Sequence, residues 1–111
     1  MVGADTAMRG EVWACAMPQP IGPHRAVILT VNRIAFPLSA VTVALITGTP
    51  GPSVTHVPVG QEAGLTKYDQ SYVNCTDLHT VDKPRLRRRL GRLAPTELRS
   101  IEGCIRQILG L

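Results

Sequence analysis

The side chains best suited to chemistry lie at the ends of two apolar segments. Arg25 begins the apolar run at residues 25–31, directly after the Pro- and Gly-rich residues 18–23, and Thr47 ends a second apolar run at residues 41–47. A guanidinium and a hydroxyl that converge on one loop face suit a phosphodiester. The cation stabilises charge that grows on the phosphorus oxygens, and the hydroxyl donates a hydrogen bond to one of them. Spacing alone does not distinguish such a site from a surface cation at Arg25 and an ordinary strand end at Thr47.

The three histidines, His24, His56 and His79, are 32 and 23 residues apart, which is not the spacing of metal ligands. His56 lies inside an apolar segment and is expected to be structural, whereas His24 and His79 lie near loop or strand ends and are freer to act. The chain has no P-loop, nucleophile elbow, dinucleotide fingerprint or paired-histidine zinc helix. The sequence therefore predicts no metal ion and no cofactor.

The three cysteines, Cys15, Cys75 and Cys104, are widely separated and odd in number. They form neither a disulfide framework nor a metal motif, so we expect reduced core thiols in a cytoplasmic protein. No apolar run approaches the roughly 18 residues of a membrane helix, and residues 1–7 lack the features of a secretory signal. The length of 111 residues allows one domain, and an apolar fraction of 44% suits a packed core.

Positive charge is concentrated in the C-terminal part of the chain. Residues 1–82 carry four Lys or Arg and six Asp or Glu, whereas residues 83–111 carry eight Lys or Arg and two Asp or Glu. Such a segment suits nucleic-acid phosphates or an acidic protein segment. One alternative is a solvated edge strand whose charges prevent aggregation. Another is a generic basic helix of the calmodulin-binding kind, which Gly91 disfavours.

Apolar alternation and β-branched runs predict strands that are separated by Pro- and Gly-rich loops. The predicted strands lie at residues 9–17, 25–31, 41–47, 54–59 and 72–81. Pro58 suggests that its strand ends at a sheet edge, and residues 60–70 are expected to form a loop. Short strands at this spacing favour a small antiparallel barrel.

The pattern changes to a helical period after Pro95, which suits a first helical position. One apolar stripe contains Leu98, Ile101, Ile105, Ile108 and Leu109. On the opposite side Glu102 precedes Arg106 by four residues, which favours an ion pair within the helix. The sequence thus predicts a mainly β domain closed by a C-terminal helix.

Several segments, in this order and spacing, resemble the MazF/PemK toxins, the ribonuclease halves of bacterial toxin–antitoxin pairs. The resembling segments are RGEVW at residues 9–13, HRAVIL at 24–29, IT at 46–47, THV at 55–57, TVDKPRL at 80–86, LGRL at 90–93 and PTEL at 95–98. The likeness spans residues 8 to 111. It implies a single toxin domain over residues 8–111, with residues 1–7 as an unstructured extension.

The resemblance implies a small SH3-like barrel of the CcdB/MazF type that assembles as a homodimer. The implied activity is metal-independent, sequence-specific cleavage of single-stranded RNA or RNA loops. The ribose 2′-hydroxyl attacks the adjacent phosphate and leaves a cyclic phosphate and a free 5′-hydroxyl. By motif position Arg25 is the principal catalytic residue and Thr47 its partner. An antitoxin with an acidic, disordered segment is the implied protein partner, and the basic C-terminal part is a docking surface for it.

The sequence departs from the family pattern around these residues. Gly48 replaces the serine that usually follows the threonine, and Asp77 and His79 stand where glutamine and arginine are usual. With His24, which is also a candidate general base, these residues are the predicted substrate-binding set. Asp77 would accept hydrogen bonds from cytosine or guanine edges and repel phosphate. The group that moves the proton stays open.

A second hypothesis belongs to a different functional class. The same scaffold occurs in the CcdB toxins, which inhibit DNA gyrase without catalysis. Arg25 followed by an apolar strand, and the later pair Ile46 and Thr47, favour the ribonuclease.

Overall fold

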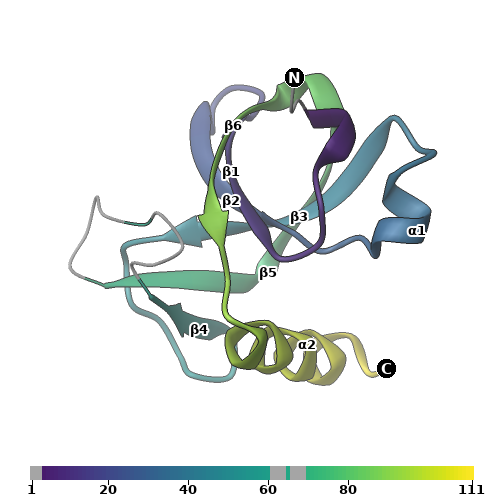
Figure 1. The fold of residues 1–111 in the computed structure, drawn as a ribbon. Helices are drawn as coiled ribbons and strands as arrows, with labels where there is room; N and C mark the ends of the chain where they lie inside the picture. The colour runs from purple at the N-terminus through teal and green to yellow at the C-terminus, as the bar shows by residue number, and fades with distance from the viewer. Residues whose placement is uncertain (1–3, 61–64, 66–69) are drawn as a thin grey trace.

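The computed structural model of the protein describes residues 4–60, 65 and 70–111. In chain order the elements are η1 (Ala4–Thr6), β1 (Glu11–Ala16), β2 (Pro23–Ile28), α1 (Asn32–Ala35), β3 (Ala40–Thr47), β4 (His56–Val59), β5 (Ser71–Asp82), η3 (Lys83–Arg85), β6 (Leu86–Arg92) and α2 (Pro95–Leu109). The strands curl into an arch, and α2 lies along β4 and β5 beneath it (Figure 1). The predicted mainly antiparallel β fold with a C-terminal helix is confirmed.

The strands form one six-stranded sheet in the order β4-β5-β3-β2-β1-β6, and every pairing is antiparallel. The basic segment supplies edge strand β6, and Pro58 lies in the other edge strand, β4. Proline suits an edge because it cannot donate to a sheet hydrogen bond. The edge position predicted for Pro58 is confirmed, and the edge strand is one of the alternatives for the basic segment. Most of the predicted loop at residues 60–70 lies outside the described residues.

Hydrophobic side chains fill both faces of the sheet. One face, which we call the helix face, packs against α2. Its cluster includes Val12, Val27, Ala44, Ile46, Val73 and Cys75 from the sheet with Ile101 and Cys104 from α2. The opposite face, which we call the barrel face, is enclosed by the curl of the sheet. Its cluster includes Trp13, Ala26, Ile28, Val43, Leu45 and Val81. Side chains alternate between these faces along each strand, which fixes where the candidate functional residues point.

Helix α2 begins as the sequence predicts and makes a different ion pair. Ala94 precedes the helix and has no side-chain oxygen, so only the Glu97 carboxylate caps this end, accepting from the Ala94 N–H at 2.8 Å. Glu102 pairs with Arg9 at the start of the domain rather than with Arg106. Arg9, ninety-three residues from Glu102 in sequence, takes the place of Arg106 as its partner and ties α2 to the N-terminal segment.

The N-terminal residues are more ordered than expected. Ala4–Thr6 form a 3₁₀ turn, and Ala7 is fully buried in the cluster on the barrel face. Residues 4–7 thus differ from the unstructured extension that we expected over residues 1–7. Residues 1–3 lie outside the described residues, and the domain boundary at residue 8 stays a prediction.

Candidate functional site

Arg25 lies near the start of β2 and points to the helix face, on the same side as Val27. Its side chain is half-buried, and Nη1 donates a hydrogen bond to Ser71 Oγ at 3.2 Å. Ser71 is the first residue of β5 and is itself buried. Ser71, which is forty-six residues from Arg25 in sequence, therefore fixes the guanidinium at one end of the sheet.

The end of the sheet at which Arg25 lies is a meeting point of strand ends, and we call it the Arg25 rim. β2 and β5 begin there, and β1, β3 and β4 end there, at Ala16, Pro23, Thr47, Val59 and Ser71. Thr47 is paired with Tyr72, the residue after Ser71. Arg25 and Thr47, far apart in sequence, are therefore both at the Arg25 rim.

The two side chains do not share one face of the sheet. Alternation along β3 sets Thr47 on the barrel face with Leu45, whereas Arg25 is on the helix face. The hydroxyl of Thr47 accepts from the Thr49 N–H at 3.1 Å and so shapes the turn that begins at Gly48. Our expectation that Arg25 and Thr47 converge on one face is corrected: they approach the rim from opposite sides of the sheet.

His24 shares the barrel face with Thr47. β2 and β3 pair through Ala26 and Leu45, and the same register extended by two residues sets His24 opposite Thr47. His24 itself is paired with Cys15 of β1 and is half-buried. An imidazole and a hydroxyl are therefore both on the barrel face at the Arg25 rim.

Asp77 and His79 form a separate pair on the barrel face. Asp77 Oδ1 and His79 Nε2 are 2.7 Å apart. His79 is paired with Val43, four residues before Thr47, so the pair is roughly 13 Å from Thr47 along the sheet. His79 lines a small cavity of about 150 Å³ with Met17 of the loop that follows β1. The carboxylate of Asp77 is already hydrogen-bonded, so this pair would meet a substrate as a unit.

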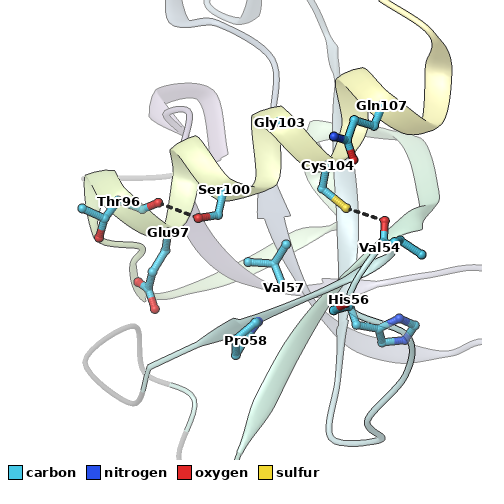
Figure 2. Close-up of a pocket in the computed structure, with 11 residues that line it drawn as sticks. Val54, His56, Val57, Pro58, Thr96, Glu97, Ser100, Gly103, Cys104 and Gln107 are labelled. Atoms are coloured by element: carbon cyan, nitrogen blue, oxygen red, sulfur yellow. Dashed lines mark hydrogen bonds between the residues drawn. The ribbon is translucent and has the colours of Figure 1, made fainter.

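A larger cleft, of about 540 Å³, separates α2 from β4 and was not predicted from the sequence. Figure 2 shows its wall of helix side chains and its floor of strand residues. Three polar side chains that line it have partners within the protein. Cys104 Sγ donates to the Val54 carbonyl at 3.0 Å, Glu97 accepts from the Gly60 N–H at 2.7 Å, and Ser100 Oγ donates to the Thr96 carbonyl at 3.1 Å. These hydrogen bonds make the cleft a structural contact between α2 and the neighbouring strand.

His56, at the edge of this cleft, is a structural residue, as the sequence suggests. Its Nδ1 is 2.8 Å from Thr55 Oγ1, and its ring meets the ring of Tyr72 edge to face at 6.4 Å between centroids. A Cβ on Gly51 would come within 2.5 Å of the imidazole ring, so the Gly51 backbone packs directly against it. These contacts hold the ring in place.

The cysteines are buried free thiols, as predicted. Burial, reinforced by a hydrogen bond with Cys104, raises the pKa of Cys75 to about 12. Burial also raises the pKa of Cys15, although the charges of Arg85 and Arg87 act in the opposite direction. Thiols held neutral in this way are poor nucleophiles.

Among residues 4–60, 65 and 70–111, no three His, Cys, Asp or Glu side chains are grouped closely enough to hold a metal ion. Within the same residues no helix is long and apolar enough to cross a membrane. The Arg25 rim itself carries a guanidinium, hydroxyls and an imidazole.

Sequence and structure comparisons agree on the relatives of this chain. Residues 8–109 match the family of PemK-like, MazF-like toxins of type II toxin–antitoxin systems. The chain is 31% identical over 90 residues to "Probable endoribonuclease MazF2" of Mycobacterium tuberculosis, in an alignment that covers 81% of this chain and 85% of that protein.

Solved structures share the fold over nearly the whole chain. An "Endoribonuclease from Mycobacterial species" matches with a TM-score of 0.82 and 25% identity, covering 96% of this chain and 93% of that one. An "Endoribonuclease in complex with its cognate antitoxin from Mycobacterial species" matches with a TM-score of 0.82 and 27% identity, covering 94% and 95%. The "Mycobacterium tuberculosis toxin MazF-mt6" matches with a TM-score of 0.78 and 26% identity, covering 91% and 97%.

Proposed function

Because the chain belongs to the PemK-like, MazF-like toxins of type II toxin–antitoxin systems, we propose that it cuts single-stranded RNA or RNA loops at specific sequences. The observation that carries this proposal is the anchoring of Arg25 by Ser71, next to the residue that pairs with Thr47. That arrangement supports a phosphate site at the Arg25 rim, with the guanidinium on one side and the threonine on the other.

The proposed reaction needs no metal ion. The ribose 2′-oxygen attacks the neighbouring phosphorus, the bond from phosphorus to the 5′-oxygen breaks, and the products are a cyclic phosphate and a 5′-hydroxyl. Charge on the two non-bridging oxygens grows in the transition state. Arg25 stabilises that charge because its guanidinium stays protonated and offers several donors. Thr47 donates a hydrogen bond to one oxygen from the other side of the sheet.

One base must accept the proton of the 2′-hydroxyl, and the departing 5′-oxygen must gain a proton. We propose His24 as the base, because its register with Thr47 sets the imidazole at the same end of the barrel face. An imidazole has an intrinsic pKa that suits proton transfer near neutrality. Asp77 and His79, farther along the same face, would contact nucleotides beyond the cut, and Gly48 leaves room for the chain beside Thr47.

We also propose a homodimer that an antitoxin inhibits. A domain of this size buries a limited core, and Leu109 and Leu111 at the end of α2 remain exposed. One relative was solved with its cognate antitoxin, which supports an antitoxin as the partner of this chain. We expect the segment of the antitoxin that binds to be acidic. The cationic side chains of β6 would attract such a segment.

The test incubates the purified protein with mixed cellular RNA in EDTA and maps new 5′-hydroxyl ends. We expect discrete cuts. Arg25→Ala should lower the cleavage rate by about 10³-fold and Thr47→Ala by about 10²-fold, because each removes a donor to the developing charge. Thr49→Ala is the matched control for the hydroxyl, since the interaction between Thr49 and Thr47 uses only the Thr49 backbone N–H.

Two outcomes would contradict the proposal. Cleavage that depends on magnesium, or that survives Arg25→Ala at the original rate, would exclude the mechanism. Intact RNA together with inhibition of DNA gyrase by the same preparation would instead establish the CcdB-like function.

A further inference from the structure

Three residues on adjacent strands form a row that ends at Arg25. Ala14 of β1 is paired with Arg25 of β2 on one side and with Arg88 of β6 on the other. Residues directly opposite each other in antiparallel strands point to the same face. The side chains of Arg88 and Arg25 therefore both lie on the helix face. Because neighbouring strands are about 4.8 Å apart, the backbones of the two arginines are separated by about 10 Å.

The residue between the two arginines has a small side chain. Ala14 is half-buried and carries only a methyl group. No long side chain of β1 therefore stands between the two guanidinium groups at this position. A chain with one negative charge per unit could lie across Ala14 and reach both cations.

Arg88 differs from its neighbour Arg89 in how its charge is used. Arg89 pairs with Trp13 on the barrel face, and its Nε donates to the buried carboxylate of Glu11 at 2.7 Å. Arg88 points to the other face and is exposed. Within the described part of the chain its side chain makes no hydrogen bond or ion pair. Arg89 therefore stabilises the fold, whereas the charge of Arg88 is available to a ligand.

We propose that Arg88 binds a backbone phosphate of the RNA next to the one that Arg25 binds, and so positions the substrate for cleavage. This inference rests on the proposed ribonuclease function. A polynucleotide seated on Arg25 carries a further charge on each adjoining linkage, and Arg88 is the cation that the strand pairing aligns with Arg25. An acidic peptide has no corresponding reason to be centred on Arg25.

The first experiment compares Arg88→Ala with the wild-type protein on an oligonucleotide that contains one mapped cut. We expect KM to rise roughly five- to tenfold while kcat stays unchanged, because the contact is made equally in the ground and transition states. The slope of log KM against log salt concentration should decrease by about 0.7, the value for one contact to a single-stranded phosphate. Arg33→Ala, on the exposed helix α1 away from β6 (Figure 1), removes the same charge and should change neither quantity.

The second experiment locates the contact. Neutral methylphosphonate linkages replace the phosphates on either side of the cut one at a time. At one position we expect the wild-type protein to lose affinity while Arg88→Ala loses none. Arg88→Lys should keep part of the sensitivity of the wild-type protein, because it retains the charge without the planar fork of donors.

The results separate this inference from the function on which it rests. If the wild-type protein cuts RNA in an Arg25-dependent manner but Arg88→Ala has an unchanged KM, the positioning role is wrong and the function stands. An equal loss in both proteins at every methylphosphonate position also overturns it. Weaker inhibition by polyglutamate in Arg88→Ala, with KM for RNA unchanged, would assign Arg88 to an acidic protein partner instead. If the wild-type protein cuts no RNA, the function and this inference both fail.

Discussion

The Arg25 rim and the cleft between α2 and β4 use polar groups in opposite ways. In the cleft, the Cys104 thiol and the Glu97 carboxylate are each held by a backbone partner. At the rim, Arg25 is half-buried and is held through Nη1 by one serine hydroxyl. The guanidinium stays protonated, so the rim carries a permanent positive charge.

This difference shows why cavity size is a poor guide to function in this protein. The cleft is large, at about 540 Å³, but its Cys104, Glu97 and Ser100 side chains already bind partners within the protein. A polar group with a protein partner contributes to stability, and a ligand that displaced the partner would have to replace its hydrogen bond. The rim keeps a cation, hydroxyls and an imidazole at the ends of strands that rigid pairing holds in place. We therefore expect substitutions at the cleft to change stability and substitutions at the rim to change catalysis.

The largest effect on stability should come from the joint between α2 and the sheet. Ile101 is fully buried in the cluster on the helix face. Ile101→Ala should lower the free energy of unfolding by about 3 kcal/mol, because it removes buried methyl groups and leaves a cavity. Urea denaturation would measure this change. The specific cleavage rate of the folded fraction should stay within twofold of wild type, and a loss of kcat in fully folded protein would break the proposed separation of the two regions.

A smaller effect should appear at the rim, and in kcat rather than in stability. Ser71→Ala removes the acceptor that fixes Arg25, so the guanidinium should visit unproductive orientations. We expect kcat to fall by roughly three- to tenfold with little change in KM, which corresponds to about 1 kcal/mol. Single-turnover cleavage of a mapped oligonucleotide would measure it.

The matched control for this serine is in the cleft. Ser100 Oγ donates to the Thr96 carbonyl within α2, so Ser100→Ala should leave kcat unchanged. Equal kcat values for Ser71→Ala and Ser100→Ala would show that the contact between Ser71 and Arg25 does not organise the site.

The sequence predicts the elements of this fold well because each has a local signal. Apolar alternation marks β1 and β5, Pro95 marks the start of α2, and a run of cations marks the edge strand β6. Such signals depend on neighbouring residues alone. The types and chain positions of Arg25 and Thr47 could likewise be recognised before the fold was known.

The arrangement of the site depends on register, which local signals do not contain. A change of one residue in register moves a side chain to the other face of a sheet. For this reason the positions of Arg25 and Thr47 on opposite faces could not be predicted. The contact between Arg25 and Ser71 joins residues forty-six positions apart and has no sequence signature.

Charge counts mislead for a related reason. Lys83 belongs to the basic segment in sequence but is buried, and its Nζ donates to the Ala35 carbonyl at 2.7 Å. Lys83 therefore stabilises the structure around α1 and is not part of the surface that attracts a ligand.

The smallest predicted effect concerns pH and belongs to the joint between α2 and the sheet, where Cys75 is buried. The pKa of Cys75 is raised to about 12 by burial, whereas an exposed thiol in the unfolded chain loses its proton near pH 9. Below pH 9 both states hold the proton and the stabilisation is complete. Between pH 9 and about 12 the unfolded chain ionises while the folded protein does not, so stability falls as pH rises.

Comparison with Cys75→Ala isolates this contribution from the other groups that titrate in alkali. From pH 8 to pH 10 the difference in unfolding free energy between wild-type protein and Cys75→Ala should shrink by about 1 kcal/mol. Urea denaturation at both pH values would measure it. A difference that stays constant would mean that the Cys75 thiol is not protected by the joint between α2 and the sheet. That joint would then be open to solvent, and the contrast with the Arg25 rim would be lost.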